Sequence, residues 1–237
     1  VVFVLEVNPR ASRTVPFVSK AIGKPLAKVA ALAMAGLSLK QQKFKKPKTP
    51  SYRSVKEAVF PFEKFSGVDT LLGPEMKSTG EVMGIAKDFG LAFAKAQIGS
   101  GNLLPLRGWA FLSVRDEDKA LSLAPAAKLK KLGFDLLATR GTAKFLQEQG
   151  IDCERVNKVL EGSPHIVDRL KNGDVALVIN TPAGKHSAQD SYSIRRTALE
   201  YRIPYFTTMA AAKAAVDGIE ALMKRGENVK SLQEYYQ

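Results

Sequence analysis

The sequence has almost no cysteine and no long uninterrupted apolar stretch. Its single cysteine, Cys153, cannot form a disulfide within the chain or supply a cysteine-based metal site. No apolar run is long enough to cross a bilayer, and no segment has the features of a signal peptide. We therefore expect a cytoplasmic protein that has no internal disulfide and does not bind membranes.

Acidic residues are scarce relative to basic ones. The chain has 23 Asp and Glu against 36 Lys and Arg, a formal net charge of +13, which indicates contact with nucleic acid or with anionic metabolites. Residues 40–56 hold many of these cations and no acid: Lys40, Lys43, Lys45, Lys46, Lys48, Arg53 and Lys56. Few aromatic residues and no nucleic-acid-binding signature accompany them. A solvated loop, or a surface facing an acidic partner domain, is therefore favoured over nucleic-acid binding.

The length of the chain allows one or two domains. Residues 99–108 are punctuated by glycine and proline and form the clear linker. We therefore expect one domain in residues 1–98 and a second in residues 109–237. The chain starts at Val1 inside an apolar run, residues 1–5, which predicts a central strand and a fragment of something longer.

The first part predicts a mixture of helices and strands. Two helices are expected within residues 14–36, the second with Pro25 at its first position and Gly36 at its end. Strands are expected at residues 54–62 and 79–86, and a helix capped by Asp88 at residues 88–98.

The second part alternates short apolar strands with helical patterns, which predicts an α/β fold with a parallel sheet and helices on both faces. The expected strands are residues 109–114, 134–138, 155–157, 175–180 and 203–207. The expected helices are residues 118–132, 142–149, 165–172, 191–201 and 210–224. Pro125 lies inside the first of these helices, so that helix should either bend there or begin later.

The predicted strand at 134–138 leads into a helix through Thr139, Arg140, Gly141 and Thr142. Such a turn presents backbone N–H groups and the positive end of a helix dipole at one point, which suits a phosphate. The alternative is an ordinary turn capped by threonine. Polar residues follow other strands as well, including Lys119, Lys158, Asn180, Thr181 and Lys185. Because the carboxyl ends of parallel strands meet at one edge, an anion pocket is expected there.

A second candidate site lies near the start of the chain. In a strand, residues two apart point to the same face, so Glu6 and Asn8 are expected to project together. A carboxylate and an amide oxygen are hard ligands suited to magnesium, and Arg10 and Arg13 lie just beyond to hold phosphates. A polar strand end with structural arginines is the alternative.

The motifs around these residues resemble the end of an ATP-grasp domain. More narrowly, they are similar to the second such domain in the family of large chains of glutamine-dependent carbamoyl-phosphate synthetase. The resemblance extends essentially to the C-terminus, and the matching strings are residues 5–10, 13–20, 25–31, 34–36, 54–57, 72–76 and 78–84.

The resemblance implies a ligase that makes carbamoyl phosphate from glutamine-derived ammonia, bicarbonate and two ATP, for pyrimidine and arginine biosynthesis. It implies that Glu6 and Asn8 bind the Mg or Mn ions that bridge the ATP phosphates, and that Arg13, with Arg10 beside it, contacts the transferred phosphate. The nucleotide-binding part precedes these residues in the family. The implied partners are therefore that missing N-terminal part and a glutamine amidotransferase small subunit, and the chain alone should be inactive.

The second part resembles the methylglyoxal synthase-like fold, as found in the family's allosteric domain. The resemblance implies that the phosphate and ribose of the effector nucleotides UMP and IMP contact Lys119, Thr139, Thr142, Lys158 and Asn180. It also implies that Glu57, Tyr205 and Thr207 lie near bound ornithine, although a plain surface carboxylate is the alternative for Glu57. Pro182 stands where some members have a second threonine, which leaves the choice of nucleotide open.

Methylglyoxal synthases themselves need an aspartate, a histidine and a Gly-Gly-Asp loop. The corresponding residues 161–168 lack that loop, His165 is expected to cap or pack, and His186 has no obvious carboxylate partner. We therefore expect no lyase activity. The alternative to the regulatory reading is a stand-alone binding module that senses a phosphorylated metabolite.

Overall fold

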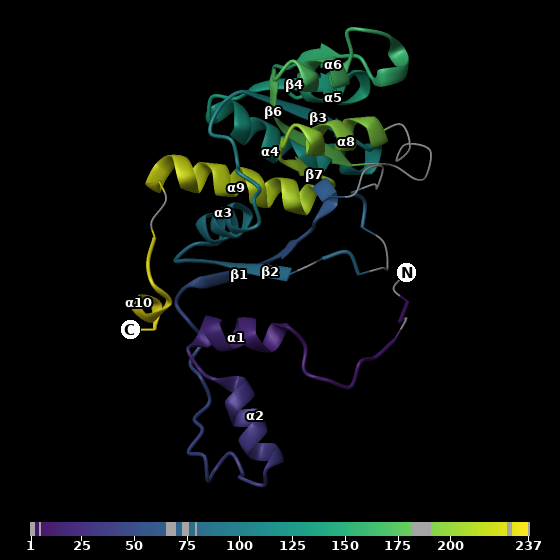
Figure 1. Ribbon diagram of the computed structural model, residues 1–237. Coiled ribbons are helices and arrows are strands. Elements are labelled where there is room, and N and C mark those ends of the chain that lie inside the picture. Colours follow the sequence, from purple (N-terminus) through teal and green to yellow (C-terminus); the bar gives the residue numbers. More distant parts are fainter. Residues whose placement is uncertain are drawn as a thin grey trace.

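The chain forms two sheets that are linked through helices (Figure 1). The computed structural model describes residues 3–4, 6–64, 70–72, 76–78, 80–181, 191–226 and 229–236. Strands β1 (Arg53–Val59) and β2 (Gly80–Ala86) pair antiparallel as a two-stranded sheet. The remaining strands form a separate five-stranded sheet in the second part of the chain.

The five-stranded sheet has the order β5-β4-β3-β6-β7, and all of its strand pairs are parallel. Its strands are β3 (Trp109–Val114), β4 (Asp135–Thr139), β5 (Glu154–Val156), β6 (Val175–Thr181) and β7 (Tyr205–Phe206). The predicted parallel α/β architecture is therefore confirmed. Strand β7 is shorter than expected and starts after Pro204, which has no N–H to donate to a ladder.

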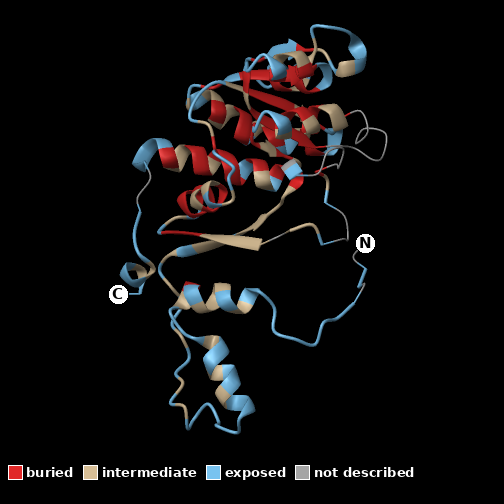
Figure 2. Cartoon of the chain, in the orientation of Figure 1, coloured by how far each residue is buried: buried red, intermediate tan, exposed pale blue. Residues whose placement is uncertain are grey.

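Helices cover both faces of this sheet. One face carries α4 (Lys119–Lys131), α5 (Arg140–Glu148) and α9 (Met209–Arg225), and the other carries α6 (Ile166–Lys171) and α8 (Tyr192–Glu200). Alternate residues of β3 face opposite ways: Leu112 packs into the first core and Phe111 into the second. Figure 2 shows this buried double layer in red.

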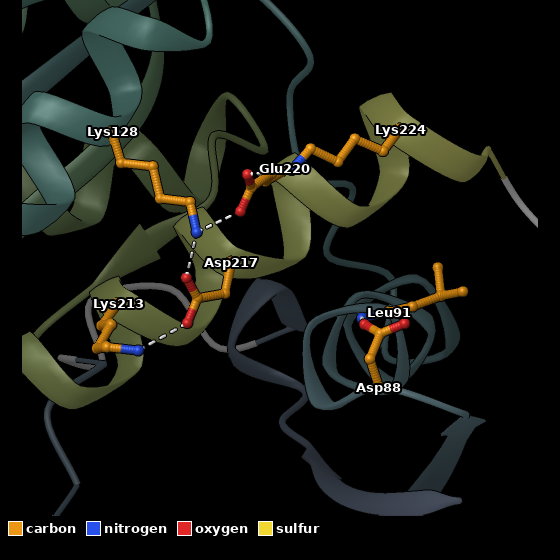
Figure 3. Close-up of polar contacts among 7 residues, drawn as sticks. All are labelled: Asp88, Leu91, Lys128, Lys213, Asp217, Glu220 and Lys224. Atoms are coloured by element: carbon orange, nitrogen blue, oxygen red, sulfur yellow. Dashed lines mark hydrogen bonds and ion pairs between the residues drawn. The ribbon is translucent and has the colours of Figure 1, made fainter.

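The first part of the chain contains α1 (Thr14–Ile22), α2 (Leu26–Met34) and α3 (Phe89–Gly99), which confirms the expected helices. The Asp88 carboxylate accepts a 2.9 Å hydrogen bond from the Leu91 N–H, so it caps α3 as expected (Figure 3). Short elements complete the described chain: η1 (Phe62–Lys64), η2 (Asp116–Asp118), η3 (Val159–Glu161) and α10 (Leu232–Tyr235).

One expectation is wrong, and the later start that was allowed for the helix around Pro125 does not occur. Within the expected strand at residues 1–5, the described Phe3 and Val4 belong to no strand and are 77% and 82% exposed. An apolar run forms a strand only where a neighbouring strand accepts its backbone hydrogen bonds. Helix α4 starts at Lys119 and continues through Pro125, which is buried, so the proline does not end the helix.

Helix α3 lies between the small sheet and α9, and glycines bring these elements into close contact. A Cβ on Gly84 of β2 would lie 1.9 Å from the Ala92 carbonyl oxygen of α3. A Cβ on Gly90 of α3 would lie 2.6 Å from the Asp217 carbonyl oxygen of α9. The first core accordingly contains residues from both sides of the 99–108 linker. Among the described helices, none combines the length and apolar character needed to span a membrane.

Candidate functional site

A cavity of about 320 Å³ opens at the carboxyl edge of the five-stranded sheet. The topology explains its position, because the chain runs from β3 to β4 and β5 on one side and later to β6 and β7 on the other. Ligands bind at such points in open parallel sheets, since the connections on the two sides diverge there. The five side chains predicted to form an anion pocket all line this one cavity: Lys119, Thr139, Thr142, Lys158 and Asn180.

The first turn of α5 forms one wall of the cavity. Thr139 occupies the N-cap position of α5 without a side-chain hydrogen bond to the helix, so the simple threonine cap considered from the sequence does not occur. Its hydroxyl lies 3.3 Å from the Ser113 Oγ and 3.4 Å from the Thr142 Oγ1. The Thr142 hydroxyl accepts a 3.2 Å hydrogen bond from the Val114 N–H, which fixes the start of α5 against the end of β3. The first N–H groups of α5 are therefore not capped by the Thr139 side chain.

Four basic and two acidic residues line the cavity, so its charge is positive on balance: Arg115, Lys119, Arg140 and Lys158 against Asp116 and Glu161. The Lys119 Nζ lies 2.7 Å from an Asp116 carboxylate oxygen. That hydrogen bond and the lysine charge lower the pKa of Asp116, which therefore remains ionised and neutralises part of Lys119. A Cβ on Gly141 would lie 3.6 Å from the same Nζ, which places the ammonium group beside the start of α5.

Buried polar groups of β6 form the opposite wall. Asn180 is only 2% exposed, and its amide nitrogen lies 3.4 Å from the Ser191 Oγ. Its Oδ1 is buried and has no hydrogen-bond partner among the described residues. Leaving a buried acceptor unsatisfied costs free energy, and a ligand that donates a hydrogen bond would recover that cost. The cavity thus combines positive charge with a fixed acceptor.

Sequence reasoning missed several lining residues, among them Ser113, Arg115 and Ser191. Arg115 directly follows β3, so a complete reading of the strand ends would have included it; its Nε lies 2.8 Å from an Asp118 carboxylate oxygen. Ser113 lies inside β3, and only its register beside β4 places its hydroxyl near Thr139. Ser191 immediately precedes α8 and carries no local signal.

The predicted metal ligands lie together but on the surface. The Asn8 amide nitrogen donates a 2.8 Å hydrogen bond to the Glu6 Oε1, and both residues are exposed. The Arg13 guanidinium lies 3.6 Å from a Glu81 carboxylate oxygen of β2, and the Arg10 Nη1 donates to the Ala11 carbonyl. The described residues include no group of three or more His, Cys, Asp or Glu placed to hold a metal. A carboxylate and an amide nevertheless suit Mg²⁺ or Mn²⁺, which take further ligands from phosphate and water.

The residues assigned to ornithine are separate from this cavity. Glu57 lies in β1 and is half-buried against α3, so it is not a plain surface carboxylate. Burial raises its pKa, and a hydrogen bond from Gln97 offsets part of that rise. Tyr205 lies in β7 and packs on the second core, and Thr207 directly follows that strand. None of these three is among the described lining residues of the cavity.

His165 caps α6, in agreement with the sequence. Its backbone N–H donates a 2.9 Å hydrogen bond to the Asp168 carboxylate, and the Asp168 N–H lies 3.3 Å from its Nδ1. The hydrogen bond from the His165 N–H, with one from the Ser163 hydroxyl, lowers the pKa of Asp168. Pro182, Lys185 and His186 lie outside the described residues.

The comparisons with known proteins agree with this architecture. Residues 122–207 match the family model of the MGS-like domain, so the second part of the chain is similar to that domain. The chain is 56% identical over 237 residues, its whole length, to the carbamoyl phosphate synthase large chain of Xanthomonas axonopodis pv. citri. It is 54% identical over 99% of its length to the protein of Methanopyrus kandleri named "Carbamoyl phosphate synthase large chain, C-terminal section". The chain therefore corresponds to the C-terminal section of the carbamoyl phosphate synthase large chain, and the family resemblance is confirmed.

The matches cover only part of each relative. The chain covers 22% of the Xanthomonas large chain and 44% of the Methanopyrus protein. A third relative, the carbamoyl phosphate synthase large chain of Pseudomonas syringae pv. tomato, is 58% identical over 92% of this chain and is covered to 20%. The chain thus spans less than half the length of each of these relatives.

Proposed function

We propose that the cavity at the sheet edge is a regulatory site for an effector nucleotide of the UMP or IMP type. The single observation that carries this proposal is the convergence of Lys119, Thr139, Thr142, Lys158 and Asn180 on one positively charged cavity. The start of α5 and the two lysines would hold the phosphate, because N–H groups and ammonium groups are the donors that phosphates accept best. The buried Asn180 Oδ1 would accept a hydrogen bond from a ribose hydroxyl.

Three or four charge-assisted hydrogen bonds of roughly 1.5–3 kcal/mol each are enough for micromolar binding after the costs of association. The nucleotide would act by linkage, because a ligand that binds one conformational state more tightly shifts the protein toward that state. In this proposal residues 109–237 are the regulatory domain, residues 1–98 are the end of the ATP-grasp domain, and residues 99–108 connect them.

The whole protein would be a cytoplasmic ligase that makes carbamoyl phosphate from bicarbonate, ATP and glutamine-derived ammonia, for pyrimidine and arginine biosynthesis. Glu6 and Asn8 would hold Mg²⁺ or Mn²⁺, which neutralises the charge of the ATP phosphates when bound. Arg10 and Arg13 would contact the transferred phosphate. The remainder of the large chain and a glutamine amidotransferase subunit would be the partners, and residues 1–237 alone would be inactive.

Ornithine is proposed as a second effector, near Glu57, Tyr205 and Thr207. The half-buried Glu57 carboxylate offers a site for an amino group. The similarity to large chains over the whole sequence favours this regulatory reading over a stand-alone module that senses a phosphorylated metabolite.

The proposal is tested by calorimetric titration of the intact protein with UMP and IMP. Lys158→Ala removes one positive charge that would face the phosphate, so we expect nucleotide binding to weaken at least tenfold. We also expect the effector to lose its influence on turnover, so that the ratio of turnover with effector to turnover without it becomes one. Lys131→Ala, at the exposed end of α4, is the matched control and should retain both. Unchanged nucleotide affinity in Lys158→Ala would contradict the proposal that this cavity binds the effector nucleotide.

A further inference from the structure

A second cavity, of about 250 Å³, lies where the C-terminal segment crosses the end of β2 and the side of α3. It shares no lining residue with the cavity at the sheet edge. Lys87, Lys95, Arg225 and Lys230 supply its charge, and Tyr52 and Tyr235 supply part of its wall. These residues come from four separate segments of the chain, so the cavity exists only while the C-terminal segment is docked.

Tyrosine hydroxyl groups hold the C-terminal segment in place beside β1, β2 and α1 (Figure 1). The Tyr235 hydroxyl donates a 3.1 Å hydrogen bond to the Ile85 carbonyl and lies 3.4 Å from the Lys95 Nζ. Its ring packs edge-on against Tyr52, with 5.4 Å between the ring centres. The Tyr236 hydroxyl donates to the Lys20 carbonyl. The wall of the cavity is therefore fixed by directional contacts.

The charge around this cavity is strongly unbalanced. Its lining holds four basic residues and one acidic residue, Glu234. The Glu234 carboxylate already accepts hydrogen bonds from the N–H and hydroxyl of Ser231, and Arg225 pairs with Asp88 at the start of α3. Within the described part of the chain, the side chains of Lys87 and Lys230 make no ion pair or hydrogen bond. Like charges gathered around a hollow repel one another, and a multivalent anion relieves that repulsion.

We propose that this cavity binds a small phosphate-bearing anion with at least two negative charges. The ammonium groups of Lys87, Lys95 and Lys230 hold the phosphate, and the rings of Tyr52 and Tyr235 seat any apolar part of the ligand. The bound anion joins the C-terminal segment to β2 and α3. The site is additional to the effector pocket and does not depend on it.

The experiment uses inorganic pyrophosphate with the intact protein and measures hydrogen exchange of residues 229–236. Three double variants each remove two positive charges. Lys87→Gln/Lys230→Gln removes the exposed cations of this cavity. Lys119→Gln/Lys158→Gln disables the sheet-edge cavity, and Lys40→Gln/Lys43→Gln lowers the net charge in the basic segment that precedes β1.

We expect pyrophosphate to protect residues 229–236 in the wild type, in the sheet-edge variant and in the charge control. In Lys87→Gln/Lys230→Gln the concentration needed for protection should rise at least tenfold, while exchange in the absence of pyrophosphate should be no faster than in the wild type. Equal protection in all four proteins would mean that pyrophosphate acts through the overall positive charge of the protein and not at this cavity, which would overturn the proposal. Protection that is lost only in the sheet-edge variant would assign the anion to that pocket, and absence of protection in the wild type would also overturn the proposal.

Discussion

The residues before β1 and those of the five-stranded sheet differ in how much apolar surface they bury (Figure 2). Helix α2 consists mainly of alanine, leucine, valine and methionine, yet it has no buried residue, and α1 buries only Ala21. Met34 is 90% exposed and Val7 is 81% exposed. In the sheet, by contrast, Phe111 and Leu137 are fully buried.

The difference indicates which region is stable by itself. A helix that is apolar on all sides is normally buried, and exposed apolar residues that gather in one region mark a contact surface. The region before β1 leaves apolar residues of this kind exposed, whereas the sheet packs into two buried cores. Figure 1 shows α2 extending away from the five-stranded sheet.

The largest expected effect tests this comparison directly. Phe111→Ala opens a hole in the second core, and we expect the free energy of unfolding to fall by about 3–5 kcal/mol. Met34→Ala on α2 should change it by less than about 0.5 kcal/mol, because that side chain is exposed. Urea denaturation followed by far-ultraviolet circular dichroism measures both. Equal losses would show that α2 belongs to the same cooperative unit as the sheet.

A smaller effect is expected where α3 packs against α9, the contact that joins the small sheet to the five-stranded sheet. Gly90→Ala places a methyl group against the Asp217 carbonyl oxygen, so α3 and α9 must separate, at a cost of about 1–3 kcal/mol. Gly80→Ala in β2 is the control, because no atom of the described residues lies within 4 Å of its added methyl group. The same denaturation measurement applies. If Gly90→Ala costs no more than Gly80→Ala, α3 and α9 are less closely packed than described.

The smallest effect concerns an ion cluster between α4 and α9 (Figure 3). The Lys128 Nζ pairs with Asp217 at 2.7 Å and also with Glu220. Burial acts to raise the pKa of Asp217, but the hydrogen bonds and charges of Lys128 and Lys213 outweigh it and lower that pKa. A carboxyl with a lowered pKa adds stability that is complete above its unfolded pKa, near pH 4, and is lost as pH falls through the folded pKa.

We therefore expect the free energy of unfolding to fall as pH drops from about 4 to about 2, and to fall less in Lys128→Met. Lys131→Met, at the exposed end of the same helix, should behave like the wild type. Urea denaturation at several pH values gives the comparison. The same slope in Lys128→Met and the wild type would mean that this cluster does not set the acid response.

Much of the sheet was predictable because its longer strands have a strong local signal. The strand at 109–114 was predicted with the bounds that the structure has, since a glycine-rich linker precedes it and every residue but one is apolar. The strand expected at residues 1–5 was wrong for its described residues, because strand formation depends on a neighbouring strand that composition does not reveal. At Pro125 the local sequence disfavours a helix, but the helix continues because the proline is buried in the core.

The sheet-edge cavity was predictable to the extent that it is built from strand ends. A parallel sheet places the carboxyl ends of its strands together, so Lys119, Thr139 and Asn180 could be grouped without coordinates. Ser113 could not, because its place in the site depends on strand register. The second cavity left no trace in the local pattern, because residues as distant as Tyr52 and Lys230 create it.

The glycine contacts between β2, α3 and α9 have a mechanical consequence. Side chains that interdigitate can absorb a small shift by changing rotamer, but backbone that touches backbone has no such slack. A tilt of α9 would therefore move α3 and β2 with it as one rigid body. Gly84 and Gly90 thus make the joint between the two sheets stiff.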